Sequence, residues 1–118
     1  MDTFKIIVPL QNEYFTTVRL TTGGICAAME FDVDSTEDVK VCVTESLLIL
    51  KRNGYRAAEV SFSIGETLAC RLTGVGEKKE KEENFADGIS FALLEALIGG
   101  VRFEKDGQGD VQEISFEA

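Results

Sequence analysis

The stretch from residue 35 to residue 54 constrains the fold of this 118-residue chain more than any other. It opens with STED, in which a hydroxyl is followed three residues later by an acid, the pattern of a capping box at a helix start. Apolar residues then recur at intervals of three and four until the pair NG closes the pattern. The stretch therefore predicts one long helix. Its opposite face is also apolar, which indicates that another helix or a partner covers it: Val41, Leu48 and Ile49.

The same kind of pattern predicts the remaining elements. Helical spacing of apolar residues predicts a helix from about residue 12, in which Gly23 and Gly24 either weaken the helix or permit a close helix contact. Pro9 is expected to end the first strand, because it has no N–H to donate. The mixed-charge segment 76–84 is expected to be a loop or a solvated helix start. A third helix is predicted over residues 85–98, and strands over residues 4–8, 57–64, 67–73, 101–104 and 111–116.

The element order is therefore β-α-α-β-β-α-β-β. Strands joined by hairpins pair antiparallel, and a sheet with helices on one face buries both layers. We expect the α+β class: a two-layer α/β sandwich with a mixed, mostly antiparallel sheet and three helices on one face, in a single domain over residues 1–118. Polar residues that alternate along the strands indicate that the other face meets water or a partner: Glu59, Ser61, Ser63, Gln112, Glu113 and Ser115.

Composition narrows the function. The 21 acidic residues outnumber the 12 basic ones, and the net charge of −9 argues against nucleic acid as a main partner. The sequence has no apolar run long enough to span a membrane and no signal-peptide pattern, so we expect a cytoplasmic protein. Histidine is absent, which excludes Ser-His-Asp catalysis and histidine-ligated metal sites. Three cysteines sit within apolar patterns and are expected to be buried structural thiols: Cys26, Cys42 and Cys70.

Several stretches, in this order, resemble the anti-sigma-factor serine kinases of bacterial sporulation and stress control. They are VPLQNEYFTTVRLTTGGICAAMEF, STEDVKVCVTES and LLEALIGGVRFE. The resemblance implies the ATPase fold shared with histidine kinases and DNA gyrase, and as partners a sigma factor or an anti-anti-sigma-type protein. It also implies a possible homodimer through the first strand and helix, with Tyr14 and Arg19 at the interface.

The first nucleotide motif of that family is a glutamate that acts as base, followed four residues later by an asparagine that ligates Mg²⁺. By resemblance, Glu45 is the candidate catalytic base. The position four residues on is Ile49, whose hydrocarbon side chain has no oxygen for a hard cation. The resemblance therefore gives no metal ligand here. The other interpretation of Glu45 is a solvated carboxylate on the flank of the helix.

The second and third motifs hold adenine and phosphate in the family. Gly74 stands where an aspartate would accept a hydrogen bond from adenine, and Gly76 remains as a cofactor-binding candidate or a simple turn glycine. Gly88 matches one glycine of the phosphate-binding helix start, and Ser90 replaces another. Asp87 is expected to be the N-cap, with its carboxylate where a phosphate would bind.

The family's lid over the triphosphate is short in this chain. Three lysines in it could reach a phosphate, although the interleaved glutamates favour a solvated mixed-charge loop: Lys78, Lys79 and Lys81. Apolar residues on both sides of the third helix could build a dimer or partner surface. Those on one side are Phe91, Leu94 and Ile98, and those on the other are Ile89, Leu93, Ala96 and Leu97.

These residues favour a regulatory protein that binds a sigma factor or an antagonist protein, with nucleotide binding and kinase activity lost or reduced and no cofactor. Phosphoryl transfer depends on positioning and on Mg²⁺, and the motifs for both are broken. The alternative is an active ATP-dependent serine kinase that uses Glu45 as base, ATP and Mg²⁺ as cofactors, and acids of the charged loop as metal ligands. A third interpretation is an unrelated small α/β domain, or one whose former pocket takes another ligand.

Overall fold

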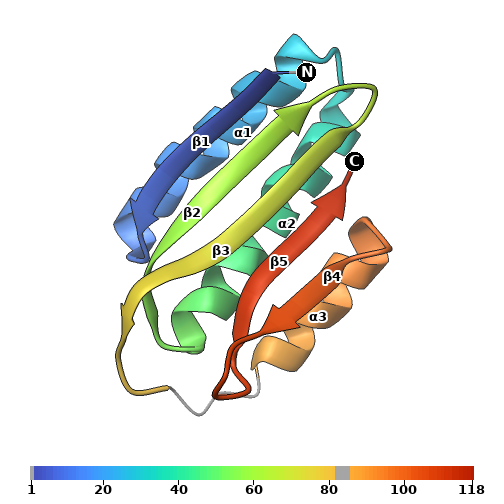
Figure 1. Ribbon diagram of the computed structural model, residues 1–118. Helices are drawn as coiled ribbons and strands as arrows, with labels where there is room; N and C mark the ends of the chain where they lie inside the picture. The colour runs from blue at the N-terminus through green and yellow to red at the C-terminus, as the bar shows by residue number, and fades with distance from the viewer. Residues whose placement is uncertain (1, 82–85) are drawn as a thin grey trace.

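A computed structural model describes residues 2–81 and 86–118. Five strands form one sheet in the order β1-β2-β3-β5-β4, and every neighbouring pair is antiparallel. Figure 1 shows the three helices together behind this sheet. The elements are β1 (Asp2–Pro9), a 3₁₀ turn (Asn12–Tyr14), α1 (Phe15–Ala28), α2 (Val33–Arg52), β2 (Tyr55–Ile64), β3 (Leu68–Lys78), α3 (Ala86–Leu97), β4 (Arg102–Lys105) and β5 (Val111–Glu117).

The predicted fold class is confirmed. The chain is a two-layer α/β sandwich of the α+β class, and the predicted order of helices and strands is the observed one. In Figure 1, α1 lies behind the β1 edge, α2 crosses behind the middle of the sheet, and α3 lies behind the β4 edge. The described strands contain no parallel pair, so the sheet is antiparallel where the sequence allowed a mixed one.

Helix α2 is the centre of the core. Its apolar residues at helical spacing are almost fully buried against β2, β3 and β5. Each such side chain contributes about 1.5–3 kcal/mol when it leaves water, so this helix supplies much of the stability. The three apolar residues of the opposite face differ in burial: Ile49 is fully buried, Leu48 is half-buried and Val41 is partly exposed. The buried residues of the predicted stripe are Val39, Cys42, Val43, Ser46, Leu47 and Leu50.

The start of α2 differs from the predicted capping box. The N-cap is Asp32, whose Oδ1 accepts a hydrogen bond from the backbone N–H of Ser35 at 2.7 Å. Asp32 precedes Ser35 at the spacing that an N-cap needs, and it begins the helix at Val33. Ser35 is therefore a residue of the first turn, and the predicted start at residue 35 is wrong.

Strands β1, β2, β3 and β5 are longer than predicted, and two of the extensions include residues expected to end a strand. Strand β1 includes Pro9, which pairs with Ala57 and is tolerated because β1 is an edge strand. Strand β3 continues through Gly74 and Gly76 to Lys78, where the sequence predicted that the strand ends at residue 73 and that a loop or helix start occupies residues 76–84. The last residues of the predicted charged loop, 82–84, lie outside the described residues.

All three cysteines are buried and unpaired, as predicted. Burial raises the pKa of Cys42 and of Cys70 to about 12 and raises that of Cys26 as well. The thiolate is the reactive form of cysteine, so these three side chains behave as small apolar core residues.

The face of the sheet away from the helices carries the polar residues that the sequence placed there. Glu59, Ser61 and Ser63 alternate with the buried Val60 and Phe62 along β2. None of the helices in the described part of the chain is both long and apolar enough to cross a membrane.

Candidate functional site at the junction of α2 and α3

Glu45 lies on α2 where this helix meets α3. Its Oε2 accepts a hydrogen bond from Ser90 Oγ at 2.6 Å, and Ser90 is only 1% exposed. One helical turn further along α2, Ile49 is fully buried in the hydrophobic core. The candidate base therefore has a serine hydroxyl as its partner, and the position of the family's metal ligand belongs to the core.

The end of α2 supplies two more polar side chains to the same junction. Arg52 Nη1 donates to Asp87 Oδ1 at 2.7 Å, and its two Nη atoms lie 3.2 and 3.0 Å from Ser90 Oγ. Asn53 Nδ2 donates to Asp87 Oδ2 at 3.0 Å. We call these five residues the α2–α3 network: Glu45, Arg52, Asn53, Asp87 and Ser90.

The α2–α3 network is closed on itself. Asn53 Oδ1 accepts a hydrogen bond from the backbone N–H of Val111 at 3.1 Å, which ties the network to β5. Arg52 is 9% exposed and Asn53 is 2% exposed. Across the described residues, no buried side-chain nitrogen or oxygen lacks a hydrogen-bond partner. Every buried side-chain nitrogen and oxygen at this junction is thus hydrogen-bonded within the same chain.

Asp87 does not have the predicted role. It lies within the first turn of α3, which begins at Ala86, so it is not the N-cap. Its carboxylate instead binds Arg52 and Asn53 on α2. Arg52 offers this carboxylate a charge-assisted hydrogen bond and Asn53 offers a second one, and these two contacts explain why the side chain turns toward α2.

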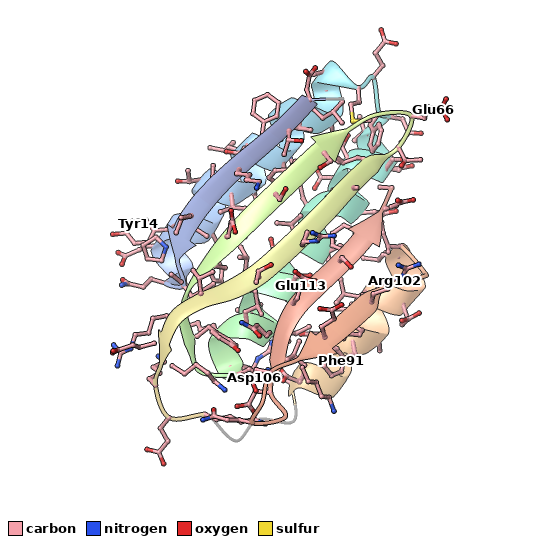
Figure 2. The ribbon with its side chains drawn as sticks, in the orientation of Figure 1. Tyr14, Glu66, Phe91, Arg102, Asp106 and Glu113 are labelled. Atoms are coloured by element: carbon pink, nitrogen blue, oxygen red, sulfur yellow. The ribbon has the colours of Figure 1, made fainter. Side chains whose placement is uncertain are left out.

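The position expected for the adenine-binding acid is covered by an aromatic ring. A Cβ placed on Gly74 would come within 2.4 Å of Tyr55 Cγ, closer than side chains pack. Tyr55 is 3% exposed and donates its hydroxyl hydrogen to Asp106 Oδ2 at 2.5 Å. Burial, with help from Asp106, raises the pKa of Tyr55 to about 12. The ring is thus held across Gly74 by the β4–β5 hairpin, where Figure 2 labels Asp106.

The two candidate glycines are exposed and lie on different elements. Gly76 is near the end of β3 with φ +80°, a conformation that favours glycine, so its backbone alone explains the residue. Gly88 is in the first turn of α3. A Cβ on either would meet no atom within 4 Å.

Lysines of the expected lid bind acids of the same chain. Lys78 Nζ pairs with Asp106 Oδ2 at 2.8 Å and with Asp110, and Lys81 pairs with Asp110 Oδ1 at 2.9 Å. Hydrogen bonds from Lys78 hold the pKa of Asp106 and of Asp110 below the usual range. The same carboxylates raise the pKa of Lys78 against the opposing effect of its desolvation. These two lysines stabilise the β4–β5 hairpin.

The residues present do not fit a magnesium–nucleotide. Mg²⁺ needs oxygen ligands, but Ile49 offers none and Glu45 is bound by Ser90. Within residues 2–81 and 86–118, no three acids or cysteines gather closely enough to hold a metal ion. The start of α3, which would hold phosphate in this fold, is bound to Arg52 and Asn53 through Asp87.

Sequence reasoning missed Arg52, Asn53 and Tyr55 as members of this site. Lys51 and Arg52 fit the negative end of a helix dipole, and Asn53 fits a helix end, so each had a local explanation. Their partners lie at least 34 residues away along the chain. The sequence held one signal for this contact. A basic residue, Arg52, follows Ile49 on the same helix, and an acid, Asp87, lies at the start of the third helix.

The order of elements and the positions of the three motifs define an ATPase-type α/β sandwich of the kind found in anti-sigma-factor serine kinases. No family model matches the chain. Individual proteins do: it is 33% identical to the serine-protein kinase RsbW of Bacillus subtilis, over 87% of this chain and 78% of that protein. It is 27% identical to the serine-protein kinase RsbW of Bacillus licheniformis, over 98% and 86%. The chain belongs to the RsbW family, as the resemblance predicted.

Proposed function

We propose that this chain is a cytoplasmic protein-binding regulator that acts on a sigma factor or an anti-anti-sigma-type protein without using ATP. Membership of the RsbW family supports the choice of partners. The α2–α3 network is the single observation that carries the loss of nucleotide chemistry. In it, hydrogen bonds within the chain engage both the candidate base Glu45 and the start of α3, where the family resemblance implies phosphate binding.

The cost of admitting a nucleotide supports this proposal. A triphosphate at the start of α3 would have to displace Asp87 from Arg52 and Asn53, or lie beside its charge. Breaking a buried ion pair by removing one partner costs about 3–5 kcal/mol, before any gain from the ligand. Adenine would also lack its acceptor, because Tyr55 covers Gly74. Glu45 would then serve to fix Ser90 and, through it, Arg52.

The outer surface of the helices supplies the docking surface in this proposal. Leu20 on α1 is 70% exposed, and Val41 on α2 is 37% exposed beside it in a shallow groove. Ile89 and Leu93 on α3 are 67% and 37% exposed, and they belong to one of the two apolar sides of this helix that the sequence offered as a partner surface. Large apolar side chains that stay in water on adjacent elements are typical of protein interaction sites.

A homodimer through the first strand and helix remains a prediction from the resemblance. Tyr14 is 43% exposed at the start of α1, where Figure 2 labels it. Arg19 is half-buried and donates to Thr16 Oγ1 at 3.2 Å. Phe4 and Ile7 of the edge strand β1 are also exposed, which supports the same surface.

The test is binding of the purified chain to the sigma factors and antagonist proteins of its own genome, with Mg–ATP or with EDTA and no nucleotide. We expect one of them to bind with the same dissociation constant under both conditions. Leu20→Asp and Ile89→Asp should each weaken binding about tenfold or more, since each places a charge in an apolar contact. Val33→Asp is the matched control, because Val33 is 77% exposed at the start of α2, away from the groove.

Three outcomes contradict the proposal. One is binding that requires Mg–ATP, and another is transfer of phosphate from ATP to a serine of the antagonist, which would restore the active-kinase alternative. The third is an absence of binding to every one of these proteins. Thermal unfolding of each variant shows whether a loss of binding comes from a loss of folding.

A further inference from the structure

The uncovered face of the sheet carries a charge pattern that neither the fold nor the proposed function requires. The strand registers place one residue from each of the five strands side by side: Lys5 pairs with Ser61, Ser61 with Arg71, Arg71 with Ser115, and Ser115 with Arg102. We call this line of residues the basic row. In a chain of net charge −9, it carries three positive charges and no acid.

The geometry of the basic row suits carboxylates. Arg71 and Arg102 are the two cross-strand neighbours of Ser115, so they lie about 10 Å apart on the same face. Lys5 lies a further 10 Å or so beyond Arg71. A guanidinium binds a carboxylate with two parallel hydrogen bonds, and the serine hydroxyls between the cations can donate a third.

Two of the three cations of the basic row have unpaired side chains. Within the part of the chain that the structure describes, the side chains of Lys5 and Arg102 form no hydrogen bond or ion pair. Arg71 is 66% exposed and forms a long ion pair with Glu113, in which Nε lies 3.8 Å from Oε1, beyond hydrogen-bonding distance. Figure 2 looks onto this face and labels Arg102 and Glu113 on it. An open hollow of about 450 Å³ lies over the part of the row from Ser61 to Arg102, and Glu117 and the Gly99-Gly100 segment also line it.

Acids on both sides limit the width of the ligand. Two residues along the strands, about 7 Å away, the registers align Glu59, Thr73, Glu113 and Glu104 in a parallel row. On the other side Glu117 of β5 faces Ala69. A broad polyanion such as duplex DNA or an anionic membrane would meet these acids as well as the basic row. A single polypeptide segment laid along the basic row lies nearer to the cations than to most of these acids.

From this pattern we propose that the basic row binds an acidic polypeptide segment of a partner protein, laid across the strands on the uncovered face. The surface is on the opposite side of the sheet from the apolar helical surface. The basic row would therefore be a second contact site. The proposal that it binds an acidic segment does not depend on whether the chain binds ATP.

The probe for this test is a fluorescein-labelled poly-glutamate peptide of about fifteen residues, followed by fluorescence anisotropy at low ionic strength. We expect binding that weakens with added salt and falls about tenfold in the double variant Arg71→Gln, Arg102→Gln. The matched control is Arg56→Gln, Lys105→Gln, which removes the same charge from two exposed positions outside the basic row. That control should change the affinity less than twofold. Both double variants should keep the native melting temperature, because all four side chains are exposed.

Equal losses in the two double variants would show that only net charge matters and would overturn the site. So would an absence of poly-glutamate binding to the native chain. Duplex DNA or phosphatidylserine vesicles that bind as tightly, through the same two arginines, would overturn the narrow acidic segment as the ligand. An uncharged poly-glutamine peptide should not bind at all.

Discussion

Arg52 joins α2 to α3 through two partners. Its guanidinium binds Asp87 and Ser90, and the ion-paired side chains are 11% and 22% exposed. We expect Arg52→Met to lower the free energy of unfolding by about 3 kcal/mol, because it leaves the Asp87 carboxylate without its cation. The neighbouring Lys51→Met should cost less than about 1 kcal/mol, since Lys51 makes one exposed hydrogen bond to Asn12.

Urea denaturation of the native chain and the two variants checks this expectation. The variant pair Arg52→Met and Asp87→Asn also forms a double-mutant cycle that isolates the coupling between the two side chains. We expect a clear favourable coupling. Equal losses for Arg52→Met and Lys51→Met, or additive effects in the cycle, would show that the α2–α3 network contributes little.

Gly74 tests whether Tyr55 fills the expected adenine position. Gly74→Ala would place its Cβ 2.4 Å from the ring of Tyr55, which is buried. We expect a loss of about 1–3 kcal/mol from overpacking. Gly24→Ala is the control, since a Cβ there meets nothing within 4 Å on α1 and should stabilise the helix by up to about 1 kcal/mol. Thermal unfolding distinguishes the two, and an unchanged melting temperature for Gly74→Ala would mean that the ring moves freely.

At the scale of single residues, the sequence was more informative about the ligand groups that the site lacks than about the side chains that fill it. Ile49 and Gly74 could be recognised because a hydrocarbon and a missing side chain cannot ligate a metal or accept a hydrogen bond, wherever they lie. The replacements could not be predicted, because Arg52, Asn53 and Tyr55 bind residues distant in sequence. Asp87 was expected to cap its own helix, and only the packing of α3 on α2 brings a cation within its reach.

Among the elements, the β4–β5 hairpin depends most on electrostatics. Lys78 at the end of β3 holds Asp106 and Asp110, and the pKa values of both acids lie below the usual range. A carboxyl whose pKa is lowered by folding stabilises the fold above its unfolded pKa of about 3.9, and this contribution is lost as pH falls through the folded pKa. Stability should therefore decline as pH falls from about 5 toward 2.

Asp106→Asn should remove part of that decline. The variant loses stability at neutral pH, because the amide cannot pair with Lys78 as a charge, and its stability should change less between about pH 5 and pH 2. Urea unfolding at a series of pH values measures both slopes. If the free energy of unfolding changes equally with pH in the native chain and the variant, the ion pair of Lys78 with Asp106 does not control acid unfolding.

The ends of elements were the weakest part of the sequence prediction. Asp32 caps α2 although STED three residues later fits a capping box, since two acceptors stood within one turn and local pattern alone does not rank them. Strand β3 extends past Gly74 because β2 beside it pairs as far as Tyr55 with Lys78. Tertiary pairing thus overrides the turn preference of the glycines.

For the molecule as a whole, the predicted α+β sandwich was confirmed because its elements have strong and distinct periodicities. The apolar stripe of α2 and the alternation of β2 leave one arrangement that buries both. The same alternation places the polar residues on the free face. Their charge pattern became visible only when the registers aligned Lys5, Arg71 and Arg102 across five strands.

We propose above all that side chains of this chain occupy the position where its fold would hold a nucleotide, and that they bind one another there. Isothermal titration with Mg–ATP tests it most directly, with the Bacillus subtilis relative, named a serine-protein kinase, as the positive control. The account predicts no heat of binding and no rise in melting temperature at millimolar Mg–ATP, whereas a ligand at a hundred times its dissociation constant adds about 2.7 kcal/mol. Saturable binding that Glu45→Ala abolishes would contradict the account.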